Sequence, residues 1–192
     1  MIWMSVALAG SMATSKPTPV ALGSGDEAKL LAGEAVLRQA QTSGDAGHAV
    51  AVQYVNAPAE IVWDVLLDYD AYPQRVDGCE QTDVYEKVGN DWYVWFEVSL
   101  PLGITSEYAT KNSIHRDDGW MAWELDPRRD SPVNVNTGYW LVTELSPTLT
   151  RLDYATEMQI PGVPSFVVKY LAKGALSDGT AWVKTVSEQL AK

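Results

Sequence analysis

In the stretch VNAPAEIVWDVLLDYDAYPQRV, residues 55–76, the apolar residues change from the alternation of a strand to the spacing of a helix. The other elements of the chain can be placed relative to this change. Residues 48–58, which overlap the start of this stretch, alternate enough to predict a strand. Pro58 then stands where the first turn of a helix tolerates proline. We therefore expect a strand that runs directly into a helix, with one strand face formed by Val50, Val52 and Tyr54.

The segment APAEIVWDVLLDY, residues 57–69, has the apolar spacing of an amphipathic helix. Trp63 and Asp64 are expected towards the edge of its apolar stripe. The helix should stop near Asp70–Tyr72, because Pro73 disfavours the α conformation in the residue before it. The stripe itself consists of Ile61, Val62, Val65 and Leu66.

The most acidic part of the chain is DVLLDYDAYPQRVDGCEQTDVYE, residues 64–86. A calcium loop needs oxygen ligands at set spacing with a glycine at its tight turn, and Pro73 interrupts any such register. An acid–base pair needs burial or charged neighbours, whereas these carboxylates are expected at a polar helix end and in a turn. We interpret Asp68 and Asp70 as ending the helix. The tyrosines at 69 and 72 then anchor the turn.

After residue 80 the pattern changes to a period of two, which is typical of strands. Three strand pairs are predicted, with turns at Gly89–Asp91, Asp117–Gly119 and Ser146–Thr148. Such an antiparallel sheet is expected to have one covered face and one wet face. In the last strand, Arg151, Asp153, Glu157 and Gln159 are assigned to the opposite face from Leu152, Tyr154, Thr156, Met158 and Ile160.

A long helix is predicted to close the chain from Pro164 onward. Its glycines, Gly174 and Gly179, cost helix propensity and suggest that a strand or a ligand passes close by. Residues 28–41 fit either a short helix or a leading strand.

The composition limits the classes of function. The chain has 192 residues, of which 46% are apolar, and this suits one folded domain. A net charge of −11 argues against nucleic acid and against resting on anionic membranes. The single cysteine, Cys79, permits no intrachain disulfide, and the separation of His48 and His115 argues against a histidine metal centre.

Residues 1–26 are expected to be a signal-like segment and a linker, followed by the domain at 27–192. The apolar run Ile2–Ala9 and the small-x-small sequence Ser11-Met12-Ala13 resemble a signal peptide that lacks its positive start. The expected location is a bacterial periplasm, reached through an incomplete or clipped signal, and otherwise the cytoplasm.

The order strand, helix, strand meander and long C-terminal helix resembles the START-like or SRPBCC superfamily, that of polyketide cyclases/dehydrases and lipid transport proteins. The resemblance is carried by residues 55–76, by TGYWLVTEL (137–145) with its Gly-x-Trp, and by TRLDYATEMQIPG (150–162). The most similar subgroup includes the coenzyme Q-binding START-like proteins. The resemblance implies an α+β helix-grip fold, in which a curved antiparallel sheet wraps around the C-terminal helix and leaves an internal cavity.

The resemblance implies that this cavity binds a hydrophobic small molecule such as a lipid, a sterol or an isoprenoid, with transient membrane contact. No cofactor, metal or catalytic residue is expected, and the loop at 160–166 is the candidate gate. The candidate ligand-binding residues combine an apolar wall with a few polar points. They are Phe96, Val98, Leu100, Tyr108, Asn112, Trp123, Trp140, Tyr154, Thr156, Met158, Val167, Tyr170, Leu171 and Gly174.

Two alternatives stay open at this point. One is a cyclase or dehydratase for a polyketide-like substrate, which needs a positioned base that the strand patterns do not reveal. The other is an interaction module in which the tryptophan-rich surface binds another protein. The oligomeric state is open as well.

Overall fold

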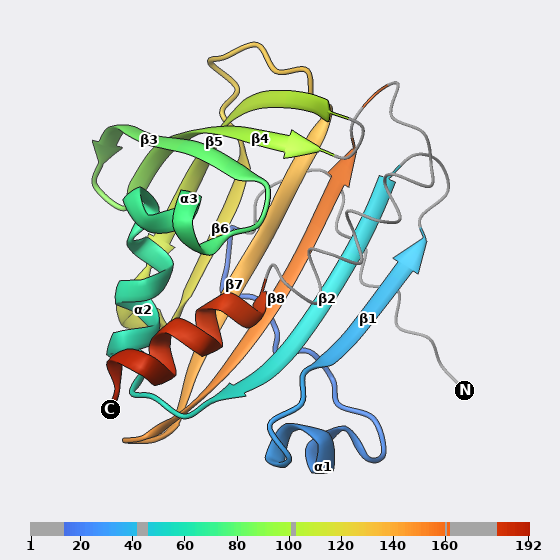
Figure 1. The fold of residues 1–192 in the computed structure, drawn as a ribbon, viewed down its shortest axis with the longest axis vertical. Helices are drawn as coiled ribbons and strands as arrows, with labels where there is room; N and C mark the ends of the chain where they lie inside the picture. The colour runs from blue at the N-terminus through green and yellow to red at the C-terminus, as the bar shows by residue number, and fades with distance from the viewer. Residues whose placement is uncertain (1–13, 42–45, 101–102, 160, 162–179) are drawn as a thin grey trace.

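The computed structural model describes residues 14–41, 46–100, 103–159, 161 and 180–192. These residues form one antiparallel sheet of eight strands in the order β1-β2-β8-β7-β6-β5-β4-β3. Figure 1 shows helices on one side of this curved sheet. The strands are β1 Val36–Gln41, β2 Ala46–Val55, β3 Cys79–Val88, β4 Asp91–Leu100, β5 Ile104–His115, β6 Trp120–Leu125, β7 Val135–Ser146 and β8 Leu149–Gln159.

The three predicted strand pairs are confirmed as the hairpins β3–β4, β5–β6 and β7–β8. The turn between β5 and β6 contains the short 3-10 helix η3 (Arg116–Asp118) and ends at Gly119. Gly119 has a φ of 78°, and a Cβ there would lie 2.7 Å from the carbonyl oxygen of Val142. Only glycine suits both constraints, since its φ is unrestricted and it brings no side chain.

The segment after β2 contains three helical pieces instead of one. Helix α2 covers Ala59–Leu67, the 3-10 helix η1 covers Tyr69–Ala71, and helix α3 covers Tyr72–Arg75. The predicted helix end near Asp70–Tyr72 is therefore wrong by a few residues. Asp68 leaves the helical region with a ψ of 65°, and Pro73 lies in the first turn of α3, where proline is tolerated.

Trp63 is a second correction in this segment. It was expected at the edge of the apolar stripe, but only 2% of it is exposed. Its side chain belongs to the core cluster that α2 forms with the sheet, so the apolar face of the helix is wider than its spacing predicts. Asp64, by contrast, is exposed and pairs with Arg116 at 2.8 Å.

Residues 28–41, which fitted a helix or a strand, contribute to both. Helix α1 covers Asp26–Leu31, and β1 follows from Val36. Gly33, with a φ of 83°, separates them. The chain needs a left-handed residue there, and glycine adopts that conformation at little cost.

The inner face of the sheet packs against α2 and against a helix at residues 180–190. Figure 1 shows these two helices across the lower half of the sheet. Hydrogen bonds tie the C-terminal helix to β2 and to the residue after it. The Gln53 amide donates to the carbonyl oxygen of Thr180 at 2.8 Å, the Lys184 ammonium donates to the Tyr54 carbonyl at 2.7 Å, and the Asn56 backbone N–H donates to Glu188 Oε1 at 2.9 Å. The helix-grip architecture expected from the resemblance is thus present.

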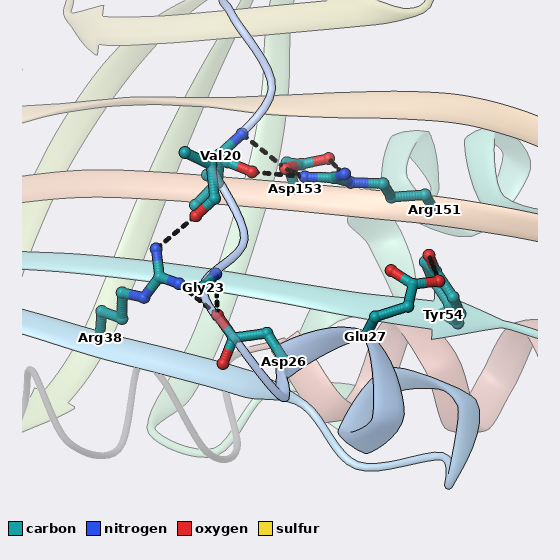
Figure 2. A network of polar contacts seen from close by, with 9 residues as sticks. Val20, Gly23, Asp26, Glu27, Arg38, Tyr54, Arg151 and Asp153 are labelled. Carbon is teal, nitrogen blue, oxygen red and sulfur yellow. Dashed lines mark hydrogen bonds and ion pairs between the residues drawn. The ribbon is translucent and has the colours of Figure 1, made fainter.

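The outer face of the sheet, which was expected to be wet, is covered in part by residues 14–31. Asp153 on this face is fully buried and pairs with Arg151 at 2.7 Å. The Val20 N–H donates to Asp153 at 2.9 Å, and Arg151 donates to the Val20 carbonyl at 2.7 Å (Figure 2). Arg151 and Asp153 of β8 are therefore partners of a crossing segment rather than solvent-facing groups, whereas Glu157 and Gln159 on the same face stay partly exposed.

Other contacts hold the same segment in place. Arg38 of β1 donates to the Ala21 carbonyl at 2.6 Å and pairs with Asp26, and the Tyr54 hydroxyl donates to Glu27 at 2.7 Å (Figure 2). Val20, Leu22 and Leu30 pack on Val36, Val52 and Tyr54. Residues 16–22 thus contact the sheet, while the domain boundary at residue 26 stays a prediction.

Candidate functional site

The inner face of the sheet has two halves that differ in burial. In the lower half, side chains of five strands pack against α2 and the C-terminal helix and are almost completely buried. The sheet residues there are Val55, Ile114, Met121, Trp140, Val142 and Leu152. In the upper half, side chains that point to the same side remain partly exposed. These are Phe96, Val98, Tyr108, Trp123, Leu125, Tyr154 and Met158.

Aromatic rings connect the two halves. Phe96 stacks on Tyr108 with 5.4 Å between ring centroids, and Trp123 stacks on Tyr154 at 5.8 Å. Trp140 lies 4.4 Å from Tyr154, which joins the upper half to the lower core. Stacked and tilted rings of this kind form an apolar wall with fixed geometry.

The tyrosines of the turn after α2 also belong to this wall. Tyr69 is 3% exposed, and its ring centroid lies 6.2 Å from that of Phe96. The ring centroid of Tyr72 lies 5.0 Å from that of Trp182 in the C-terminal helix. The Tyr72 hydroxyl donates to the Leu66 carbonyl at 2.7 Å, which satisfies an end group of α2. The anchoring role predicted for both tyrosines is confirmed.

Gly138 gives Trp123 its position. A Cβ at residue 138 would lie 2.3 Å from the Trp123 ring and 2.4 Å from the Ala155 carbonyl oxygen. The indole therefore lies directly over the backbone of β7. Its Nε1–H donates to Asn136 Oδ1 at 3.0 Å, which fixes the ring in that orientation. The glycine of the Gly-x-Trp sequence thus has a packing function.

Polar groups on the inner face are few and mostly paired. The Asn112 amide donates to Thr110 Oγ1 at 2.8 Å and to the Trp92 carbonyl at 3.3 Å. The Thr156 hydroxyl donates to the Thr137 carbonyl at 3.2 Å. These groups satisfy one another, so they orient the wall without adding charge to it.

The two tyrosines of the upper half are neutral donors at ordinary pH. Burial raises the pKa of Tyr154 to about 12, in spite of a hydrogen bond with Thr156 that lowers it. Burial also raises the pKa of Tyr108 well above its usual value. The described side chains of the upper half include no carboxylate, imidazole or amine. A proton acceptor for acid–base chemistry is thus missing from this part of the described chain.

The carboxylates of the acidic stretch do not contribute to this wall, although the tyrosines between them do. Asp68, Asp70, Asp77 and Glu80 are exposed, and Asp68 ends α2 and pairs with Arg75 at 2.8 Å. Among the described residues, no group of three or more His, Cys, Asp or Glu side chains is placed to hold a metal ion. The interpretation of Asp68 as a helix-ending residue is confirmed, but it is wrong for Asp70, which lies in η1 after α2 has ended.

All candidate ligand-binding residues from the strands lie on the inner face. Leu100, Asn112, Trp140 and Thr156 are buried there, and the other strand candidates are partly exposed. The candidates from the last helix (Val167, Tyr170, Leu171 and Gly174) lie outside the described residues, as does nearly all of the candidate gate at 160–166.

The sequence interpretation missed several residues of the same wall. Leu125 and Asn136 face inward with the predicted residues, and strand alternation alone could have identified them. Tyr69 and Tyr72 were assigned only to a turn. No local pattern indicates that this turn folds back over the sheet.

The family model for polyketide cyclase/dehydrase and lipid transport proteins matches residues 55–178. The chain belongs to this family. A comparison of the sequence with curated proteins gives no match.

Solved structures with the same fold share little sequence with this chain. The Zhui aromatase/cyclase from Streptomyces sp. R1128 is 16% identical, with a TM-score of 0.61 over 76% of this chain and 93% of that one. A START superfamily protein from Mycobacterium smegmatis is 18% identical, with a TM-score of 0.62 over 74% and 98%. A STAR-related lipid transfer protein from Xanthomonas axonopodis is 14% identical, with a TM-score of 0.60 over 81% and 99%. At these identities the likeness establishes the fold alone.

Proposed function

We propose that the protein binds a hydrophobic small molecule against the upper half of the inner face, as a carrier or sequestering protein. The observation that carries this proposal is the partial exposure of inward-pointing apolar side chains, above all Phe96, Trp123 and Met158. Such surface gains about 25 cal/mol for each Å² removed from water. A ligand that covers about 200 Å² of apolar surface would thus gain roughly 5 kcal/mol without a charged contact.

The polar points of the wall suit a ligand that is mostly apolar. Tyr108 and Tyr154 are neutral phenols whose pKa burial raises, and the described strand residues that face inward with them in the upper half carry no charge. A mostly apolar site with a few hydrogen-bonding groups is the usual form of a small-molecule pocket. A lipid, a sterol or an isoprenoid has this character.

The relatives support the same class of ligand. The family description includes lipid transport, and one solved structure of this fold is a STAR-related lipid transfer protein. The aromatase/cyclase of the same fold keeps a cyclase or dehydratase as the second candidate. That chemistry requires a positioned base. The described upper half offers only tyrosines, so binding without catalysis is the proposal we favour.

A location in the bacterial envelope is part of the proposal. It rests on the signal-like pattern of residues 1–13. Cleavage after Ala13 would leave intact the contacts that Lys16 makes with η3 and Val20 makes with β8. Within the described part of the chain, no helix has the length and apolar character needed to cross a membrane. N-terminal sequencing of the protein from fractionated host cells tests this location and the cleavage.

Recovery of the ligand tests the function. The full chain is purified from its own host without detergent, and native mass spectrometry is followed by organic extraction. We expect a bound mass that disappears on extraction and belongs to a hydrophobic molecule. A protein that carries no such mass, and that binds no member of a panel of lipids, sterols and isoprenoids, would contradict the proposal.

A further inference from the structure

The sheet is incomplete between β5 and β7. Strand β6 pairs with β5 only along Thr110–His115, and with β7 only along Gly138–Leu141. Residues 104–109 of β5 therefore have no strand beside them on that side within the described chain. Residues 126–134 span the gap as the loop at the top of Figure 1.

A pocket of about 530 Å³ lies at this gap. Its volume is within the range of small-molecule sites, about 300–1,000 Å³. Residues whose side chains belong to opposite faces of the sheet line it, so the pocket passes around the free edge of β5. Its lining includes Leu100, Ser106 and Tyr108 from the inner face, Trp95 from the outer face, and Arg129 and Pro132 from the loop.

Tyr108 connects this pocket to the upper half of the inner face. Its side chain lines the pocket, and its ring also stacks on Phe96 at 5.4 Å. Leu100 lines the pocket too and packs in one cluster with Val133 and Met158. A molecule that lies on the upper half could therefore extend one end into the pocket.

The loop that forms the rim is held by charged and aromatic contacts. The Tyr85 hydroxyl donates to Asp126 at 2.5 Å, and Arg128 donates to the same carboxylate at 3.0 Å. The guanidinium of Arg129 stacks 3.8 Å above the Tyr85 ring. The rim is thus pre-formed, which lowers the entropic cost of binding.

Ser106 is the feature of this pocket that the fold does not explain. It is 7% exposed, and its hydroxyl has no hydrogen-bond partner in the described structure. A buried hydroxyl without a partner is costly unless something bonds to it. The pocket also holds the carboxylates of Glu107 and Asp130 against the single guanidinium of Arg129, which disfavours an anion.

We propose that this pocket receives the uncharged, oxygen-bearing end of an amphipathic ligand, whose apolar body lies on the upper half, and that Ser106 Oγ hydrogen-bonds to that end. The proposal rests on the proposed function, and it adds a polar end to the ligand and a position for it.

The experiment compares two probes on the full chain. Diphenylhexatriene is a hydrocarbon that reports apolar binding by fluorescence, and dodecanol displaces it while offering one neutral hydroxyl. Ser106→Ala removes only the hydroxyl. Ser187→Ala is the matched control, since Ser187 is also buried with an unpartnered hydroxyl but does not line this pocket. Dodecanoate replaces dodecanol in a parallel series.

We expect Ser106→Ala to weaken dodecanol binding about 3- to 10-fold, the range of one neutral hydrogen bond, and to leave diphenylhexatriene unchanged. Dodecanoate should bind the unaltered protein more weakly than dodecanol. An unchanged dodecanol affinity in Ser106→Ala, an equal loss in Ser187→Ala, or tighter binding of dodecanoate overturns this inference while the proposed function stands. If neither diphenylhexatriene nor dodecanol binds the unaltered protein, the proposed function fails as well.

Discussion

The lower and upper halves of one sheet face serve different purposes in this protein. Both halves include residues of β5, β6 and β8, and both are built from similar apolar and aromatic residues. In the lower half, α2 and the C-terminal helix bury Val142 and Leu152 almost completely. In the upper half, Phe96, Trp123 and Met158 keep part of their surface exposed. Residue type therefore does not separate the core from the candidate site here; the packing of α2 and the C-terminal helix on the lower half does.

This comparison predicts that substitutions in the lower half affect stability most. Trp63→Ala should lower the free energy of unfolding by about 3–5 kcal/mol, because it leaves a large cavity beside the sheet. Urea denaturation measures the loss. The matched change Trp123→Ala should cost clearly less, since Trp123 is already partly exposed. Equal losses at the two tryptophans would contradict the division of the face.

Substitutions on the outer face should cause the next largest loss of folding stability. Asp153→Ala should cost about 3 kcal/mol, because it leaves the half-buried Arg151 without its carboxylate partner. It also removes the acceptor for the Val20 N–H, so residues 16–22 should exchange amide hydrogens faster. Hydrogen exchange measures this directly. Unchanged exchange in this segment would show that the ion pair does not hold it.

Gly138→Ala tests the position of Trp123. The added methyl would clash with the Trp123 ring and with the Ala155 carbonyl, so we expect a loss of about 1–3 kcal/mol. The displaced indole should also change binding of diphenylhexatriene to the upper half. Ala122→Gly, on the opposite face, is a control that should leave probe binding unchanged. Normal stability and probe binding in Gly138→Ala would contradict this packing role.

The Asp126 carboxyl, in the loop at the rim of the pocket, should make the stability of the protein depend on pH. Burial pushes its pKa upward, but hydrogen bonds from Arg128 and Tyr85 outweigh burial and lower the pKa to about 2. A carboxyl with a lowered pKa stabilises the fold above its unfolded pKa near 3.8, and this contribution is lost as the pH falls towards 2. Asp126→Asn should therefore be about 1–2 kcal/mol less stable than the unaltered protein at pH 6.

Thermal unfolding of both proteins between pH 6 and pH 2 measures this contribution. The difference between them should shrink as the pH falls below about 4. A difference that stays constant over this range would contradict the assigned pKa.

Met158→Ala should have the smallest effect on stability and a clear effect on binding. Met158 lies on the upper half and is only partly buried, so the loss should be about 1 kcal/mol or less. Removing this apolar contact should weaken diphenylhexatriene binding about tenfold, which corresponds to about 1.4 kcal/mol. A large loss of stability with unchanged binding would place Met158 in the core instead.

Strand pairing and the inner face could be predicted from sequence because a strand has a period of two. The turns at Gly89 and Gly119 separate the alternating runs, and every strand candidate for the site lies on the inner face. The cover on the outer face could not be predicted. Residues 14–26 have a linker-like composition, and their bonds to Asp153 and Arg151 span more than 130 residues of sequence.

The helical segment shows why the other details failed. Pro73 was expected to end a helix, but the chain had already left it at Asp68 and used the proline to begin α3. Local preference cannot distinguish these two uses of proline. The gap between β5 and β7 could not be predicted from the sequence either. It depends on how far β6 pairs with each neighbouring strand and not on any local pattern.

Photolabelling can show where a hydrophobic molecule binds. A diazirine-bearing dodecanol is bound to the full chain and irradiated, and the labelled peptides are identified by mass spectrometry. We expect labels on peptides from the upper half, on residues 96–108, 123–125 and 154–158, and their loss on competition with unlabelled dodecanol. Labels confined to the outer face or to exposed loops, or labels that dodecanol does not displace, would contradict the claim that the upper half binds a hydrophobic molecule.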